Sequence, residues 1–136
     1  MDEIEADDGA VFYAAGVFYY LKTEDVKKLT AAMAERFPGG VLAFDSCNRR
    51  GAKMMTKTWL KEAGITDVGA YFSLEDPKEL SLWSGSFRQV VSRSYMRGYR
   101  DIYNDVSLLH KLMIRFCDGL VKMRIVRISF KENTAD

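Results

Sequence analysis

Residues 10–25 read AVFYAAGVFYYLKTED, and this stretch decides the fold that we expect. Its apolar run lacks strict alternation, which is typical of a strand covered on both faces, as in parallel sheets. The run ends at Gly16, and Thr23 then begins a helix as its N-cap, followed by two acidic residues that suit the positive end of a helix. The stretch therefore predicts a buried strand over residues 10–16 that leads into a crossover helix.

The crossover helix connects this strand to a second one. Apolar side chains recur at helical spacing from Val26 to Phe37, and the sequence PGG at residues 38–40 stops the helix. Residues 41–44 then form a short apolar strand that ends at Asp45. A strand, a helix and a strand with short joints predict a βαβ unit, in which the strands are parallel and the crossover is right-handed.

The remaining chain predicts further strands and helices within one α/β domain over residues 1–136. Some segments alternate between apolar and polar residues, as strands do, and others have the spacing or the capping residues of helices. The predicted elements are a helix over residues 46–63 closed by Gly64, an extended piece over residues 68–74, a short helix that begins at Asp76 and Pro77, a strand over residues 87–96, an amphipathic helix over residues 102–116 and a strand over residues 120–130. Residues 1–8 are expected to be an acidic arm or the end of a helix, and residues 131–136 a frayed tail.

The same periodicity predicts which side chains share a face. In the helix over residues 46–63 the inward side chains are expected to be Met55, Trp59 or Leu60, and Ala63. The amphipathic helix has one apolar side formed by Val106, Leu109, Leu112, Met113 and Phe116. In the strand over residues 87–96, Phe87, Val91 and Arg93 are expected to share one face. In the strand over residues 120–130, Val121, Met123 and Ile125 are expected to share one face.

Composition limits the classes of function. Hydrophobic residues make up 48% and charged residues 29% of the 136 residues, which is typical of a globular domain. The net charge of +1 argues against a general nucleic-acid binder, which usually has a clear basic excess. No apolar run approaches the length of a membrane helix, and the acidic start is neither a secretory signal nor a transit peptide.

The cysteines and the histidine argue against a metal site. Cys47 and Cys117 lie far apart in the sequence, and His110 is the single histidine, so neither a disulfide framework nor a zinc site is expected. We expect two buried thiols, no metal, a cytoplasmic location, and neither a nucleic acid nor a membrane as a partner.

Chemistry is expected where the two parallel strands end, because ligands in open α/β sheets bind outside the carboxyl ends of the strands. The first end supplies Gly16, which lets the backbone approach a ligand closely, and a pair of tyrosines with flat faces. The second end supplies Asp45, Ser46 and Asn48, which offer hydrogen-bonding groups and a candidate base.

Each of these features also has a structural interpretation. Gly16 could serve only as a turn residue, and Asp45 with Ser46 could cap the following helix. Most of the aromatic side chains between Phe12 and Tyr20 are expected in the core. The sequence contains no nucleophile elbow, P-loop or glycine-rich loop after a first strand, so these catalytic and phosphate-binding motifs do not explain the strand ends.

Residues 16–46, GVFYYLKTEDVKKLTAAMAERFPGGVLAFDS, resemble the middle of the leucine carboxyl methyltransferase and tetracenomycin-type O-methyltransferase family. That family has the pattern (A/S)xGVxxY(L/F) after its fourth strand and FPGGxLxFD on its fifth. The first pattern is matched here by Ala14, Gly16, Val17, Tyr20 and Leu21, and the second by residues 37–45. The likeness continues at residues 75–80 and Trp83, where the family commonly has DDPxELxxW.

The resemblance covers the carboxyl-terminal half of the family's Rossmann-like domain and implies its strand order. The sheet would hold the family's fourth, fifth, seventh and sixth strands, with residues 120–130 as the antiparallel seventh strand between the fifth and the sixth. The family's glycine-rich first strand and the acidic ribose ligand of its second strand have no counterpart in this sequence. We therefore expect a partial domain, from a truncated or split enzyme, that binds its cofactor weakly or is inactive alone.

The resemblance also implies an activity. These are class I enzymes that transfer a methyl group from S-adenosylmethionine to an oxygen atom of a small molecule, such as a polyketide, or of a carboxylate. The residues implied at the cofactor are Ala15, Gly16, Val17 and Tyr20, and those implied at the acceptor are Asp45, Ser46 and Asn48, with Asp45 as the candidate catalytic base. Many relatives have Glu where this chain has Ala15, so a carboxylate contact to the cofactor from this position is not expected.

Two other classes of function remain open at this stage. The chain could be a non-catalytic interaction module, because a sheet that starts at residues 10–16 exposes an apolar edge that favours pairing. In that case we expect a homodimer, or pairing with a separately encoded N-terminal half. A regulatory or nucleotide-binding domain that uses the same strand ends is the third hypothesis.

Overall fold

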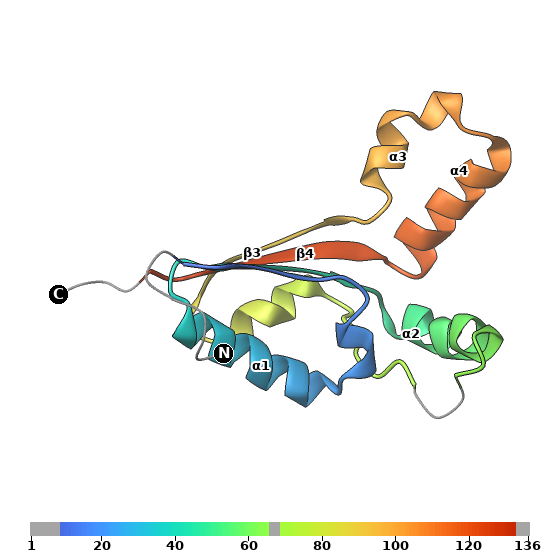
Figure 1. Ribbon diagram of the computed structural model, residues 1–136. Coiled ribbons are helices and arrows are strands. Elements are labelled where there is room, and N and C mark those ends of the chain that lie inside the picture. The colour runs from blue at the N-terminus through green and yellow to red at the C-terminus, as the bar shows by residue number, and fades with distance from the viewer. Residues whose placement is uncertain (1–8, 66–68, 133–136) are drawn as a thin grey trace.

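One four-stranded sheet organises the computed structural model, which describes residues 9–65 and 69–132 (Figure 1). The strand order is β1 (Val11–Ala14), β2 (Val41–Ser46), β4 (Arg124–Phe130), β3 (Phe87–Ser94). β1 and β2 are parallel, and β4 is antiparallel to both β2 and β3. The α/β class and the inserted antiparallel last strand are therefore confirmed. The prediction for residues 1–8 lies outside the described residues, as does most of that for the tail.

The helical segments are short, apart from the crossover helix. That helix, α1 (Thr23–Arg36), begins with Lys22 at the N-cap position, so the prediction that Thr23 caps it is wrong by one residue. The other helical segments are η1 (Phe18–Tyr20), α2 (Arg49–Met55), η2 (Thr56–Leu60), η3 (Pro77–Leu82), α3 (Arg97–Asp101), η4 (Tyr103–Asp105), α4 (Leu108–Arg115) and η5 (Phe116–Leu120). Of these, η3 begins as predicted, with the Asp76 side chain accepting a hydrogen bond from the Lys78 N–H.

The main core lies on one side of the sheet, where α1 and η3 cover the strands (Figure 1). α1 contributes the predicted apolar stripe, with Val26 and Phe37 fully buried. The sheet contributes every second residue of its strands, a set that includes Leu42, Phe44, Val126, Ile128 and Phe130. Leu80 of η3 closes the core from the far side and is also fully buried, so the βαβ unit and the short helix pack as the sequence predicts.

The opposite side of the sheet is largely bare. On β1, the side chains of Val11 and Tyr13 are 83% and 74% exposed, whereas those of Phe12 and Ala14 pack against the core. The prediction that this strand is covered on both faces is wrong for the residues described. An apolar run indicates that both faces of a strand can be buried. A layer of helices on each side of the sheet is needed to bury them.

Local irregularities overturn two predicted faces in the last strands. A bulge between Phe87 and Gln89 shifts the register of β3, so Phe87 and Val90 both pack on the core instead of lying on opposite sides. On β4 the buried apolar residues are Val126, Ile128 and Phe130, and Ile125 is 40% exposed on the bare side. Ile125 was expected on the apolar face of this strand. Because side chains in a strand alternate, one residue of offset reverses the face.

The two longer helices predicted after β2 are broken into shorter pieces. Ser46 is the last residue of β2 and Asn48 is the N-cap of α2, so α2 starts at Arg49. A π-helical turn follows it at Thr56. Leu60 is buried as predicted, but Ala63 is exposed. Gly64 ends the segment with a φ of 73°, a conformation that favours glycine.

Residues 95–123 leave the sheet between β3 and β4, and we call this segment the excursion. Its α3, η4 and α4 project beyond the bare side at one end of the sheet (Figure 1). The predicted apolar side of the amphipathic helix is mostly exposed, with Leu109 at 75% and Leu112 at 54%, while Ile114 is fully buried instead. Amphipathic spacing indicates a helix, but packing partners decide which side is buried.

Candidate functional site

The carboxyl ends of β1 and β2 are joined by one short hydrogen bond. The Gly16 N–H donates to Oδ1 of Asp45 over 2.6 Å. Gly16 has a φ of 67°, and no atom lies within 4 Å of the position that a Cβ would take. Asp45 therefore does not cap the following helix, and the Gly16 backbone borders open space at the strand end.

A cavity of about 380 Å³ opens at this point between the strand ends and the excursion. Gly16, Tyr19 and Asp45 form the part of its wall that comes from the βαβ unit. The rest of the wall consists of Met55, Tyr95, Met96, Met113, Cys117 and Met123. Four methionines and a cysteine make this wall apolar and adaptable, because methionine side chains are flexible and polarizable. The volume falls in the range of about 300–1,000 Å³ that is usual for small-molecule sites.

Two protonated groups lie under the cavity beside Asp45. Burial, reinforced by the charge of Asp45, raises the pKa of Tyr19 far above its ordinary value. Burial also raises the pKa of Cys47 to about 11, although the nearby Tyr19 hydroxyl works against this rise. The phenol and the thiol therefore keep their protons at neutral pH, and Cys47 is a poor nucleophile.

The Tyr19 hydroxyl is buried and has no hydrogen-bond partner among the described residues. Tyr19 as a whole is 2% exposed and packs with Cys47 and Ala52, with Met55 and Met123 against them. An unpaired buried hydroxyl costs about 1–3 kcal/mol.

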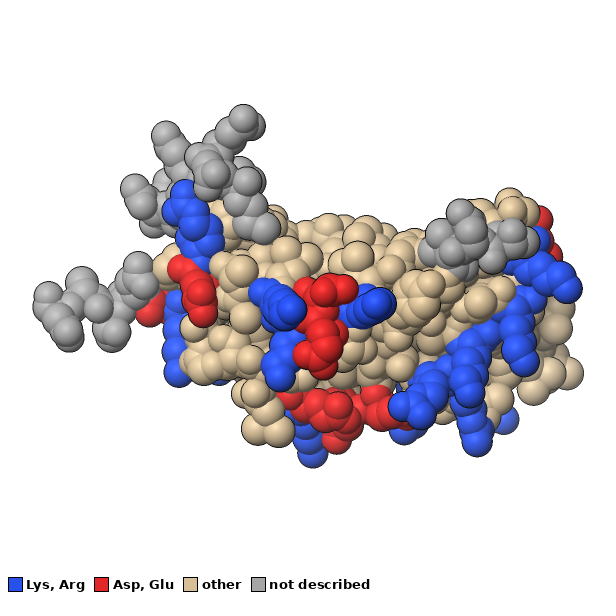
Figure 2. Space-filling view, turned by 90° about the horizontal axis from the view of Figure 1, so that it is seen from below, with Lys and Arg blue, Asp and Glu red and all other residues tan. Residues whose placement is uncertain are grey.

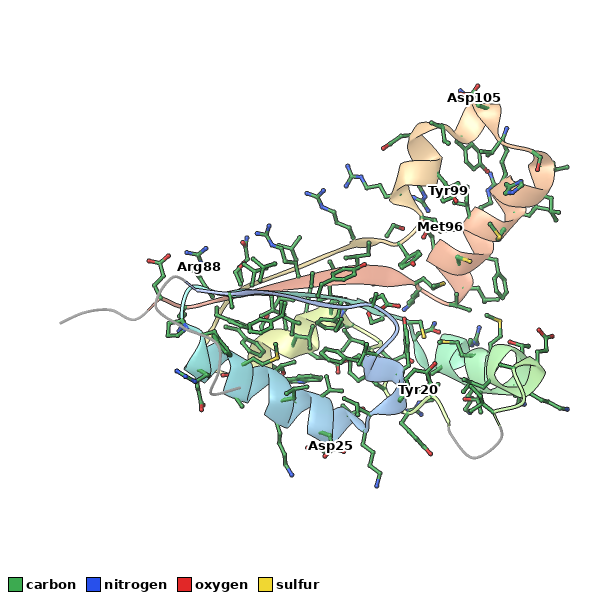
Figure 3. All side chains as sticks on the ribbon, in the orientation of Figure 1. Tyr20, Asp25, Arg88, Met96, Tyr99 and Asp105 are labelled. Atoms are coloured by element: carbon green, nitrogen blue, oxygen red, sulfur yellow. The ribbon has the colours of Figure 1, made fainter. Side chains whose placement is uncertain are left out.

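The structure brings Gly16 and Asp45 together but separates the other predicted site residues from the cavity. Ala15, Val17 and Tyr20 are exposed at the strand end, with Val17 at 51% and Tyr20 at 43%, and do not line it. Tyr20 lies on the side of the sheet that carries α1 (Figure 3).

The side chains of Ser46 and Asn48 contribute to the fold and do not line the cavity. Ser46 is 1% exposed, and its place two residues after Phe44 turns it to the core face. Asn48 is the N-cap of α2: its Oδ1 accepts from the Gly51 N–H and its Nδ2 donates to the Leu120 carbonyl, each over 3.0 Å. Asn48 therefore ties α2 to the end of the excursion.

Sequence reasoning missed most of the cavity wall. Tyr19 was expected either to offer a flat face at the strand end or to lie in the core; it is buried, and its hydroxyl end faces Asp45. The residues from the excursion lie far from the strand ends in sequence, and no motif links them. One signal was available: Met113 and Cys117 are four residues apart and so share one face of a helix.

Two other kinds of site were searched for in the parts of the chain that the structure covers. Residues 9–65 and 69–132 contain no group of three or more His, Cys, Asp or Glu that could hold a metal ion. Within the same ranges, no helix has the length and apolar character needed to cross a bilayer. Both cysteines are free, as predicted, although Cys117 is only half-buried.

Comparison with known proteins gives a distant likeness among solved structures. No family model matches the chain, and no curated protein matches it. Among solved structures, the chain is similar to mycolic acid cyclopropane synthase CmaA1, crystallised with SAH and CTAB, with a TM-score of 0.43 and 10% sequence identity. The match covers 90% of this chain and 55% of that protein, so the chain spans about half the length of its neighbour. At this score and identity the likeness carries no inference about function.

Proposed function

We propose that these residues form the carboxyl-terminal half of a class I S-adenosylmethionine-dependent O-methyltransferase domain. The observation that carries this proposal is the strand order β1-β2-β4-β3 with β4 antiparallel to both neighbours. The motifs that resemble the methyltransferase family imply the same order. Asp45, the last residue of the motif at residues 37–45, and the AAGV segment at residues 14–17 lie at the carboxyl ends of the two parallel strands.

The residues present fit one wall of a cofactor site. The open space at Gly16 and the free strand end allow the backbone to approach a ligand, and the exposed ring of Tyr20 offers a flat surface. S-adenosylmethionine would supply an electrophilic methyl group. No glycine-rich loop follows a first strand within these 136 residues, so we expect residues outside this sequence, on the same chain or a partner, to complete the site.

The chain's own contribution to the reaction would be positioning. The apolar cavity excludes water from an acceptor held between the strand ends and the excursion. Asp45 presents a carboxylate that is oriented by the Gly16 N–H, so its second oxygen can accept a proton from an acceptor hydroxyl. We propose a small molecule with one hydroxyl or carboxylate group as the methyl acceptor, a class that includes polyketides.

Titration with S-adenosylhomocysteine, followed by two-dimensional amide NMR, tests the cofactor site. We expect millimolar binding, with the largest shifts at residues 15–20 and Asp45, because the chain provides only one wall. Tyr20→Ala should weaken the response, whereas Tyr13→Ala is the control at an exposed tyrosine of the preceding strand β1, since that ring points to the bare side. Shifts spread evenly over β3 and η3, or equal effects of the two variants, would contradict the proposal.

Self-association is a second candidate function, supported by β1. This strand is at an edge of the sheet, pairs only with β2, and exposes Val11 and Tyr13 on its bare side. Exposed apolar edges favour pairing with another strand. We propose a second copy of the chain as the partner, and light scattering at increasing concentration tests it: a dimer that Tyr13→Lys dissociates is expected, and a monomer at every concentration would exclude it.

A further inference from the structure

A second hollow lies on the bare side of the sheet, beside the excursion. Its volume is about 540 Å³. The floor is apolar and consists of Ala43, Val91 and Ile125 from three adjacent strands. We call this hollow the arginine groove, because Arg93, Arg97 and Arg127 line it. Figure 3 shows nitrogen-tipped side chains that rise from this face between the labelled Arg88 and Met96.

Strand register places two of these guanidinium groups close together. Arg127 of β4 is opposite Val91 of β3, and Arg93 of β3 is opposite Ile125 of β4. The two arginines are thus diagonal neighbours on one face, with Cα atoms about 7–8 Å apart. At that separation one anionic group can accept hydrogen bonds from both forks.

No carboxylate neutralises this charge within the described residues. The ion pairs found there engage Arg88 with Glu132 and Arg100 with Asp118, and none engages the three arginines of the groove. The lining contains no acidic residue. Asp45 is on the same face, but its carboxylate is turned to the Gly16 N–H and lines the neighbouring cavity.

Positive charge elsewhere on the molecule is arranged differently. Figure 2 shows lysines and arginines gathered at the end that holds α2 and η2, where Arg49, Lys53 and Lys57 are exposed. Those cations lie on α2 and η2, and none of them lines the arginine groove. Cations around an apolar hollow, by contrast, select a ligand that combines a hydrophobic body with an anion.

We propose that the arginine groove binds a small anionic ligand with an apolar, ring-sized body. The body lies on the floor of Ala43, Val91 and Ile125, and the anionic group bridges Arg93 and Arg127. Arg97, at the start of α3, closes the groove from the excursion. Tyr95 lines both this groove and the methionine-walled cavity, so the two sites adjoin. The proposal does not rest on methyl transfer.

A pair of fluorescent probes tests the proposal without any cofactor. The probes are 8-anilinonaphthalene-1-sulfonate and N-phenyl-1-naphthylamine, which share an apolar body but differ in the anionic group. We expect the sulfonate to bind with one saturable site and about tenfold or more tighter than the neutral amine. Added salt should weaken the sulfonate only, because charge screening does not affect the amine.

Substitution of the two bridging arginines identifies the site. Arg93→Gln with Arg127→Gln should weaken sulfonate binding about tenfold or more and leave amine binding unchanged. Arg88→Gln is the matched control, because it removes an exposed arginine from the same strand, outside the groove. Circular dichroism checks that each variant is folded.

Four results would overturn the proposal. They are no saturable binding of the sulfonate, equal affinity for both probes, equal loss in the control and the double variant, and loss of both probes in the double variant. The last result would mean that the apolar face binds dyes without regard to charge. None of them bears on the S-adenosylhomocysteine titration, which reports on residues 15–20 and Asp45.

Discussion

The two sides of the sheet are built from the same strands but differ in what covers them. On the covered side, Leu42, Phe44 and Ile128 are at most 1% exposed beneath α1 and η3. On the bare side, Val11 and Tyr13 of β1 and Ile125 of β4 are 40–83% exposed. The difference teaches that strand sequence sets which residues can be buried, and that neighbouring layers set which residues are buried.

The largest expected difference concerns stability on the two sides. Phe44 is fully buried, with the rings of Phe18 and Phe72 at centroid distances of 5.0 and 6.2 Å. Phe44→Ala should lower the free energy of unfolding by about 3–5 kcal/mol because it leaves a cavity. Tyr13→Ala on the bare side should change it by no more than about 0.5 kcal/mol.

Urea unfolding followed by circular dichroism measures both values. If Tyr13→Ala costs as much as Phe44→Ala, the bare side is covered in solution, and the contrast between the two sides fails.

The second prediction concerns how the free energy of unfolding depends on pH. The unfolded Cys47 thiol titrates near 9.0, whereas burial raises its pKa to about 11 in the folded protein. Between these values the unfolded chain releases the proton and the folded chain keeps it, so the folded state loses stability as pH rises. The loss on this account should be on the order of 2–3 kcal/mol by pH 11.

Cys47→Ala should flatten the dependence of the unfolding free energy on pH between 9 and 11. The half-buried Cys117 in the excursion is the comparison: burial and the neighbouring Asp118 also raise its pKa, so Cys117→Ala measures how much of the slope comes from that side. An unchanged slope in Cys47→Ala would show that the thiol is hydrated in the folded state.

The smallest effect concerns how the excursion is held to the sheet. The Asp118 side chain is 1% exposed; its Oδ1 accepts from the Met96 N–H over 3.2 Å, and its Oδ2 pairs with Nε of Arg100 over 2.9 Å. Asp118→Ala should lower the free energy of local opening of residues 95–123 by about 1–2 kcal/mol. Half of the Arg100 side chain is exposed, so its ion pair adds little to that value.

Amide hydrogen exchange separates local from global opening. Exchange should accelerate in α3, α4 and η5 and stay unchanged in β2 and β4. Asp105→Ala, at an exposed carboxylate of the same excursion, is the matched control and should leave exchange unchanged. Equal acceleration in β2 would mean that the excursion and the sheet open as one unit.

Much of the fold could be predicted from local sequence because local chemistry decides it. Pro77 with Asp76 starts η3, the PGG at residues 38–40 ends α1, and apolar runs form the parallel pair. The position of the antiparallel β4 between β2 and β3 came from the family resemblance, since nothing local to residues 124–130 specifies its neighbours.

The candidate site could be predicted only in part. Gly16 and Asp45 were found because parallel strands bring their ends to one edge, and they are joined by a hydrogen bond. Ser46 and Asn48 were expected at the acceptor, but strand register turns Ser46 to the core and Asn48 caps α2. The methionine-walled cavity joins residues from Gly16 to Met123, and the arginine groove joins residues from three separate strands, so spacing along one segment does not reveal either site.

The sequence by itself determined where strands, helices and turns form, because backbone propensity, caps and turn residues act over a few neighbours. Only the tertiary structure decided which faces are buried, where β3 shifts its register and which side chains meet at the cavity and the groove. The physical reason is that burial and charge pairing depend on both of the surfaces that pack together. The sequence of one strand specifies only the surface of that strand.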